Sequence, residues 1–205
     1  SSLDWNLIYN KKQDYDKFIG VSNFDVDGYA YFTQNDGTNV NAKEFMEDGY
    51  ILCDYVDEDA QNYITKFRFD LNYRGYSTAY IRVRLIEQFT NAKNQIVAIN
   101  QIKFKLADNW IDNRLNDLYF YSKKLYSSTD KDVLTTTGKA KLMTVPVIEG
   151  LSDTYANVGS IDSTLVTNQY LKMRLSIYIE AVQPNRTEEY WGMDEDEIPT
   201  EDATT

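Results

Sequence analysis

A chain of 205 residues is long enough to bury a real core, and it is expected to form one domain with a tail. It contains no His, which excludes Ser/His/Asp triads, Cys/His pairs, imidazole bases and the usual zinc and iron sites. Its net charge of −11 argues against a free nucleic-acid binder, and it lacks a membrane-length apolar run or a signal-peptide core. With 17 Tyr and many Asn, Thr, Val and Ile, the composition predicts an all-β, soluble protein without membrane contact.

Residues 1–20 alternate aromatic and charged side chains without a sustained period, and we interpret them as an arm that docks through its aromatics. Asn23, Asp25 and Asp27 then have the opening spacing of a calcium loop, with Gly28 at the turn. Gln34 stands where such a loop needs a bidentate Glu, and the residues between resemble a strand. A plain turn is therefore favoured over this metal site, and no cofactor is expected.

The main domain is expected to span residues 21–183 and to contain eight to ten strands. The first strands are expected at Gly28–Thr33, Tyr50–Val56, Ile64–Leu71 and Thr78–Phe89, and the later ones at Gln95–Leu106, Leu118–Tyr126, Val133–Thr137, Lys139–Val147 and Tyr170–Gln183. The strands at 64–71 and 78–89 flank a turn-like segment, which favours an antiparallel hairpin. One helical turn is expected within residues 108–117, and a long loop over residues 149–168. Uneven connections favour a Greek-key sandwich or jelly roll of antiparallel strands.

The strand at Tyr170–Gln183 has the clearest pattern in the chain. Apolar side chains alternate with polar ones there, which predicts that Leu171, Met173, Leu175, Ile177 and Ile179 face the core. The core face of the hairpin is expected to present Phe67, Phe69, Ile81 and Val83 to them. The single Cys53 lies in an apolar run and is interpreted as a buried hydrophobe rather than a reactive thiol.

Five expected strands carry two basic residues at positions i and i+2, which places each pair on one face of its strand. The pairs are Lys66/Arg68, Arg82/Arg84, Lys103/Lys105, Lys139/Lys141 and Lys172/Arg174. They are either solvated outer faces relieved by Asp70, Glu87 and Glu180, or a basic sheet face for an anionic partner.

Glu87 and Glu180 are candidates for the paired acids of a glycoside hydrolase, because both are expected on the polar faces of strands. The Tyr and Trp side chains favour a second interpretation, a carbohydrate-binding module, since aromatic rings on a sheet or loop stack on sugars. The tyrosines are spread over every segment, however, which is more typical of core and interface positions. Catalysis is the least favoured of these alternatives.

Residues 184–205 form an acidic tail, with eight acids and Arg186 giving −7 of the net −11. Such a segment is disordered when free, so we expect Tyr190 and Trp191 to anchor it in an apolar niche. Asp194, Glu195, Asp196 and Glu197 would then lie near basic side chains on strands. A neighbouring subunit is favoured as the docking surface over the chain's own basic face.

The segment Glu-Ala-Val-Gln at 180–183, followed by Glu-Glu-Tyr-Trp-Gly at 188–192, resembles the final strand and exit of single-jelly-roll coat proteins of small icosahedral viruses. The resemblance implies a capsid protein that self-assembles into a virion shell. Such coat proteins commonly contact nucleic acid through a basic N-terminal arm, which this sequence lacks, so either the arm was lost or this shell does not contact a genome. A carbohydrate-binding or adhesive β-sandwich, extracellular or on a cell surface, is the alternative.

Overall fold

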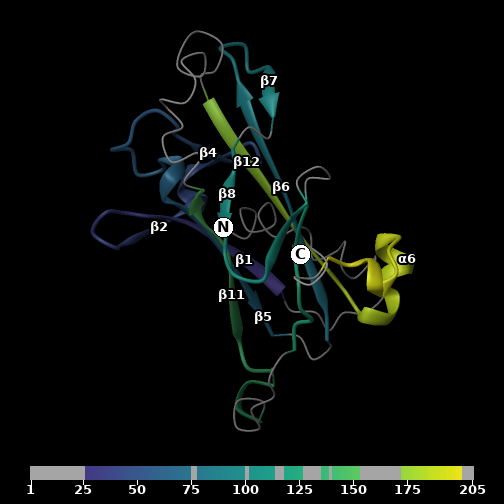
Figure 1. Cartoon of the computed structure of the whole chain (residues 1–205). Helices are drawn as coiled ribbons and strands as arrows, with labels where there is room; N and C mark the ends of the chain where they lie inside the picture. The colour runs from purple at the N-terminus through teal and green to yellow at the C-terminus, as the bar shows by residue number, and fades with distance from the viewer. Residues whose placement is uncertain are drawn as a thin grey trace.

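The strand with the clearest sequence pattern, β12 (Lys172–Val182), lies inside a sheet in the computed structural model (Figure 1). The structure describes residues 26–74, 78–99, 102–113, 118–126, 135–138, 140–152 and 172–199. Along β12 the apolar side chains at alternate positions are buried, and Met173, Leu175 and Ile179 are at most 1% exposed. The predicted register is confirmed for the described part of the strand. Leu171 lies outside the described residues.

Two antiparallel sheets pack against each other, as the all-β sandwich prediction required. Sheet A has the order β2-β1-β5-β11-β8, and sheet B has the order β3-β4-β12-β6-β10-β9, with β7 also paired to β6. The strands of sheet A are β1 (Val26–Thr33), β2 (Asn39–Asn41), β5 (Phe67–Tyr73), β8 (Phe104–Leu106) and β11 (Met143–Leu151). Those of sheet B besides β12 are β3 (Met46–Glu47), β4 (Tyr50–Cys53), β6 (Tyr80–Thr90), β7 (Ile96–Ile99), β9 (Trp110–Asn113) and β10 (Leu118–Tyr121).

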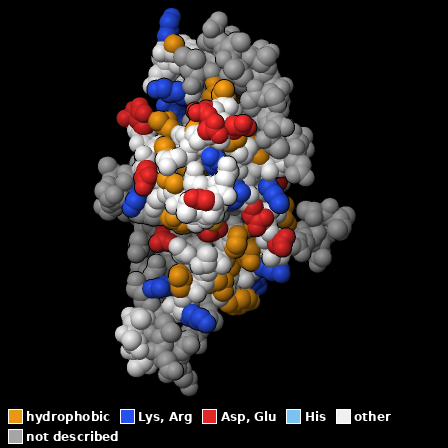
Figure 2. All heavy atoms as spheres, turned by 90° about the vertical axis from the view of Figure 1, so that its left-hand side faces the viewer, with side chains coloured by type: hydrophobic (Ala, Val, Ile, Leu, Met, Phe, Trp, Pro, Cys, Tyr) orange, Lys and Arg blue, Asp and Glu red, His pale blue; other side chains and the backbone are white. Residues whose placement is uncertain are grey.

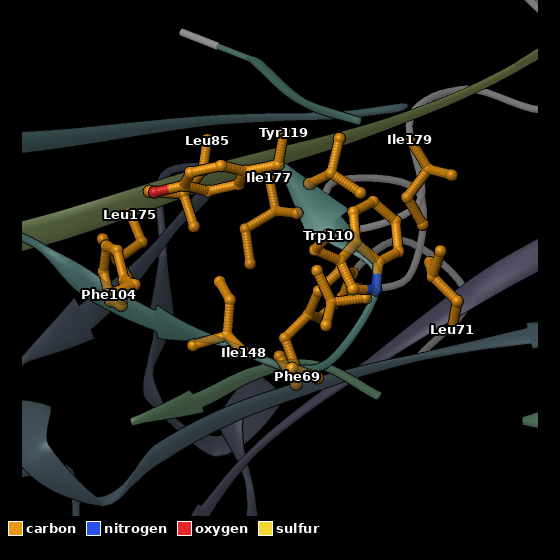
Figure 3. Close-up of a cluster of buried hydrophobic side chains, with 14 of the residues drawn as sticks. Phe69, Leu71, Leu85, Phe104, Trp110, Tyr119, Ile148, Leu175, Ile177 and Ile179 are labelled. Atoms are coloured by element: carbon orange, nitrogen blue, oxygen red, sulfur yellow. The ribbon is translucent and has the colours of Figure 1, made fainter. Parts of the chain in front are cut away.

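Side chains from both sheets fill the space between them (Figure 3). Leu85 and Ile177 come from sheet B, while Phe69 and Ile148 come from sheet A, and all four are at most 1% exposed. Trp110 spans the two layers, because its indole N–H donates a hydrogen bond of 2.8 Å to the carbonyl of Pro146 on β11. A buried indole needs such a partner, and here the partner ties sheet B to sheet A.

Gly28 allows β1 to approach the core closely. A Cβ at this position would lie 2.6 Å from the Phe69 ring and 3.0 Å from the Ile179 side chain of the opposite sheet. The strand begins two residues before the predicted Gly28, at Val26, so Asp27 is part of the strand and is exposed. The predicted turn before Gly28 therefore does not include Asp27.

The predicted hairpin between residues 64–71 and 78–89 is wrong. β5 pairs with β1 and β11 in sheet A, whereas β6 pairs with β12, β10 and β7 in sheet B. The inward faces were predicted correctly, since Phe67, Leu71 and Ile81 are all fully buried. Alternation identifies which face of a strand is buried, but it does not identify the strand that pairs with it.

Other strand boundaries also differ from the predictions. The single strand expected over residues 95–106 is two strands, β7 and β8, which belong to different sheets. The expected helical turn at 108–117 contains the strand β9 instead, and residues 135–137 of an expected strand are helical. β4 ends early because the Asp54 carboxylate accepts hydrogen bonds from the backbone N–H groups of Val56 and Asp57, which turns the chain.

Short helices complete the described structure. They are the 3-10 helices η1 (Ala42–Phe45) and η2 (Ile64–Lys66) between strands, and η5 (Pro184–Arg186), α6 (Thr187–Trp191) and η6 (Glu195–Glu197) in the tail. The predicted N-terminal arm at 1–20 lies outside the described residues, as does most of the loop predicted at 149–168. No helix in the described parts of the chain is long and apolar enough to cross a membrane.

Candidate functional site

The tail packs on the outer face of sheet B of its own chain. After β12 the backbone forms η5 and α6, and Gly192 in the left-handed conformation (φ 66°) ends the helix. The described part continues through η6 to Pro199. Figure 1 shows α6 beside the end of β12. The sequence analysis favoured a neighbouring subunit as the docking surface. In this single chain the tail docks on the chain's own sheet B instead.

Trp191 is the main aromatic contact of the tail. Its indole ring lies under the Arg82 guanidinium, 4.3 Å from ring centre to the guanidinium carbon, and meets the Phe120 ring edge-on at 6.2 Å. Phe120 lies opposite Arg82 on the outer face of sheet B, yet it is only 1% exposed. The tail therefore buries apolar surface that a bare sheet would expose to water.

Arg82 also forms an ion pair with Glu180, its cross-strand neighbour on β12. Burial lowers the pKa of the Arg82 guanidinium, whereas the charge of Glu180 and its hydrogen bond raise it. An Arg remains protonated under these conditions. Its guanidinium therefore contacts the Glu180 carboxylate and also the face of the Trp191 ring. The end of β12 and the helix α6 meet at this one side chain.

Glu195 makes the second polar contact of the tail with the domain. Its Oε1 accepts hydrogen bonds from the Tyr80 hydroxyl at 2.8 Å and from the Lys124 ammonium at 2.8 Å. These two donors lower the pKa of the Glu195 carboxyl, and the bond to Glu195 raises the pKa of Lys124. Burial, together with Glu195, raises the pKa of Tyr80 to about 12.

The other predicted tail residues make different contacts. Tyr190 is partly buried against the core, and its hydroxyl accepts a hydrogen bond from Arg186 of the tail itself at 3.3 Å. Asp194 and Glu197 form a capping box around η6, and Asp196 is exposed. Among the four predicted acids, Glu195 alone forms an ion pair with the domain in the described part of the chain.

Sequence reasoning did not identify three of the residues that hold the tail. Ile198 is only 3% exposed and belongs to the core cluster. Tyr80 and Lys124 donate hydrogen bonds to the Glu195 carboxylate. Ile198 could have been found, because it is an isolated apolar residue in an acidic segment. Tyr80 and Lys124 carry no local signal, since only the tertiary fold brings them together.

Eight of the ten residues in the predicted basic pairs, all of them described, do not form one surface. Lys66, Arg68, Lys103 and Lys105 lie in or beside strands of sheet A, whereas Arg82, Arg84, Lys172 and Arg174 lie on sheet B. On sheet B the antiparallel pairing places Arg82 opposite Glu180 and Arg174 opposite Gln88, so the two basic pairs lie at opposite ends. Figure 2 shows basic and acidic side chains interspersed on the side of the molecule that it presents.

Lys172 and Arg174 line a hollow in the outer face of sheet B. Its other walls include the acidic residues Glu47 and Asp48, together with Leu52, Thr90 and Asn94. The Arg174 guanidinium is held over the Tyr50 ring at 4.3 Å and donates a hydrogen bond of 3.0 Å to Gln88. Two acids thus face two bases, which leaves this end of the sheet without an excess of positive charge.

The predicted pair of catalytic carboxylates is contradicted by the structure. Glu87 lies on the core face of β6, is fully buried and accepts a hydrogen bond from the backbone N–H of Ile102. Glu180 lies on the outer face of sheet B, paired with Arg82. Two carboxylates on opposite faces of a sheet cannot flank one glycosidic bond. The inward position of Glu87 was not predicted, because the neighbouring inward positions of β6 are apolar and an acid is expected on the outer face.

Of the weak metal candidates, Asn23 and Asp25 lie outside the described residues, and Asp27 lies on β1. No group of three or more acidic, Cys or His side chains is placed to hold a metal ion in the described parts of the chain.

Comparisons with models of protein families, with curated proteins and with solved structures find no match to this chain. The fold and the docked tail therefore carry the functional argument alone.

Proposed function

We propose that this chain is a structural protein of jelly-roll topology, a capsid protein that self-assembles into the shell of a virion. The observation that carries the proposal is the order in which the longer strands pair.

A jelly roll is a long antiparallel ribbon folded over on itself, so the second strand pairs with the seventh, the third with the sixth and the fourth with the fifth. If β1, β4, β5, β6, β10, β11 and β12 are counted as the first seven strands, all three pairings occur: β4 with β12, β5 with β11 and β6 with β10. The remaining short strands are then insertions. This nested order supports a jelly roll over other sandwich topologies.

The first strand departs from that scheme. In a jelly roll it pairs with an eighth strand, but here β1 pairs directly with β5, and α6 follows β12 in the described part of the chain. The tail follows β12 of sheet B and packs on the outer face of that same sheet. The end of the chain is therefore used to cover the outer face of a sheet rather than to complete the other one.

The residues that resemble coat proteins also support the proposal. Glu180, from the first part of the matching segment, pairs with Arg82, and Trp191, from the second part, stacks on the same guanidinium. The two parts of the resemblance are thus one structural unit, in which a strand end and a helix are fixed to β6. Such a unit gives every subunit of a shell the same exit path.

The test is size-exclusion chromatography with electron microscopy on the purified chain. Closed particles of uniform size are expected, and the ratio of absorbance at 260 and 280 nm would report any nucleic acid they carry. A chain that stays monomeric over the accessible concentration range would contradict the proposal. Deletion from Asn185 onward should weaken assembly and leave the monomer folded, because every strand of the two described sheets precedes the tail.

A second candidate function, glycan binding by the sandwich, is favoured by one feature of sheet A. Tyr29 and Tyr31 stack on its outer face with ring centres 4.8 Å apart, and the Tyr31 hydroxyl donates a hydrogen bond to Asp70 at 3.1 Å. Burial and Asp70 raise the pKa of Tyr31 to about 12. Aromatic rings beside a carboxylate are typical of saccharide sites. A glycan array with the wild type and Tyr31→Ala tests this alternative, which predicts a signal that the variant loses.

A further inference from the structure

β7 is an edge strand with two exposed apolar side chains. Ile96 is 50% exposed and Val97 is 37% exposed. In the pairing with β6, Ile96 lies opposite Thr90 and Ala98 lies opposite Phe89, so Val97 is the extra residue of a bulge. The segment Ile-Val-Ala-Ile at 96–99 also carries no charge, in a chain whose net charge is −11.

The position of β7 explains this exposure. It pairs with the last residues of β6, Gln88 to Thr90, whereas β10 pairs with β6 at positions 82–84. Figure 1 shows β7 at the end of the β6–β12 pair that lies away from α6. Among the described residues no strand pairs with the second edge of β7. Within the described parts of the chain, its outer backbone groups therefore have no partner strand.

A strand that is apolar on both faces is typical of the interior of a sheet. Natural edge strands are usually protected by charged residues, Pro or a bulge on the free edge. β7 has neither a charge nor Pro, and its one protective feature is the bulge at Val97 in its pairing with β6. The sequence of β7 thus fits an internal strand, although within one chain it lies at an edge.

We infer that the outer edge of β7 pairs with the β7 edge of a second copy of this chain, antiparallel and about a twofold axis. An antiparallel edge is complementary to itself, because its free N–H and C=O groups alternate in the same way on both copies. The absence of charge removes like-charge repulsion across the axis, and the exposed Ile and Val side chains would cover each other. The inference rests on the proposed self-assembly and specifies one of its contacts.

The first test compares Val97→Lys with Val56→Lys in the full chain. Val56 is 49% exposed in the turn after β4, so it is a matched apolar-to-charge control away from β7. Val97→Lys should raise the dissociation constant of the dimer at least about tenfold, because burial is lost and like charges meet at the axis. The control should associate like the wild type. Sedimentation velocity measures association, and circular dichroism melting verifies the fold of each variant.

The second test uses disulfide trapping and does not depend on weakening the strand. Single Cys substitutions at positions 96–99 place a thiol along the predicted axis, and the native Cys53 is buried and gives little background. At least one of these variants should form a covalent dimer on mild oxidation, and Val56→Cys should not. If none cross-links and Val97→Lys associates like the wild type, the inference is wrong.

The outcomes separate this contact from the shell. A wild-type chain that forms the β7 dimer but no larger particle would contradict the proposed shell and support the β7 contact. Particles that assemble equally well from Val97→Lys would overturn the inference and leave the shell standing. A wild type that stays monomeric overturns both.

Discussion

Arg82 and Trp191, separated by more than half of the chain, stack with the guanidinium carbon 4.3 Å from the centre of the indole ring. The contact fixes α6 to β6 on the outer face of sheet B, and the ion pair of Arg82 with Glu180 fixes β12 to the same point. The tail is therefore attached to the two longest strands of the sandwich.

Trp191→Ala should release the tail without unfolding the domain. The variant loses a stacked cation and an apolar contact with Phe120, which together contribute roughly 1–3 kcal/mol to docking. Limited proteolysis should then cut within residues 184–199 faster than in the wild type. Tyr126→Ala is the control, since Tyr126 is 60% exposed and its loss should leave the cleavage pattern unchanged. Equal cleavage of both variants would show that Trp191 does not hold the tail.

Acidification should loosen the tail through Glu195. Its pKa is lowered by Lys124 and Tyr80 in the folded state, so its contribution is present above the ordinary Glu value and is lost as the pH falls through the lowered pKa. Both partners are partly exposed, so the effect is small and screened by salt. Tail proteolysis of the wild type should rise below about pH 4.5. Glu195→Gln should show raised cleavage already at pH 7, unlike the exposed control Asp196→Asn.

Leu175→Ala should destabilise the sandwich by about 2–5 kcal/mol, because it removes a buried side chain from between the sheets. Leu175 is 1% exposed and lies among the core side chains labelled in Figure 3. Leu142→Ala is the same chemical change at a site that is 44% exposed, and it should cost about 0.5 kcal/mol or less. Urea unfolding of the two variants makes the comparison, and similar midpoints would contradict the placement of β12 in the core.

Gly28→Ala should also destabilise the protein, by about 1–3 kcal/mol, since a methyl group there overlaps the Phe69 ring. The double variant Gly28→Ala with Phe69→Leu should recover part of the loss relative to Phe69→Leu alone, because the smaller side chain makes room for the methyl group. Thermal melting of the set measures this coupling. Additive losses would mean that β1 and β5 are not in the contact described.

The Cys53 thiol should resist modification in the folded protein. It is 5% exposed, and burial, followed by the nearby Glu87 and Asp54 charges, raises its pKa well above the ordinary value. A chromogenic disulfide reagent should react with it at pH 8 only after denaturant is added. Rapid reaction of the native chain would contradict the burial of β4 beneath the opposite sheet.

The periodicity of the sequence predicted the all-β class and the buried faces of the strands, because alternation follows directly from strand geometry. β12 was predicted nearly to the residue, and Phe67 and Ile81 were placed correctly in the core. Pairing was not predictable in the same way. The chain changes sheets between β5 and β6 and again between β7 and β8, and a local turn signal does not distinguish a hairpin from such a crossing.

The tail illustrates the same limit at the candidate site. Trp191 was predicted as an anchor because it is one of the few large apolar side chains in the acidic segment. Tyr80 and Lys124 were missed because they become neighbours of Glu195 only in three dimensions. The basic pairs show the converse. Arg82/Arg84 and Lys172/Arg174 each lie on one strand as predicted, whereas Lys66 and Lys103 precede the strands that carry their partners. Strand order divides these pairs between two sheets and gives Arg82 and Arg174 separate partners.

The location of β12 has a consequence for how the protein is made. β12 is the last of the described strands to leave the ribosome, yet it lies between β4 and β6 and pairs with β6 along its whole length, from Lys172 opposite Thr90 to Val182 opposite Tyr80. Until it emerges, the longest ladder of sheet B is missing and the apolar inner faces of β5 and β6 have no complete cover. The core must therefore close after β12 is synthesised, in a late step that depends on contacts distant in sequence.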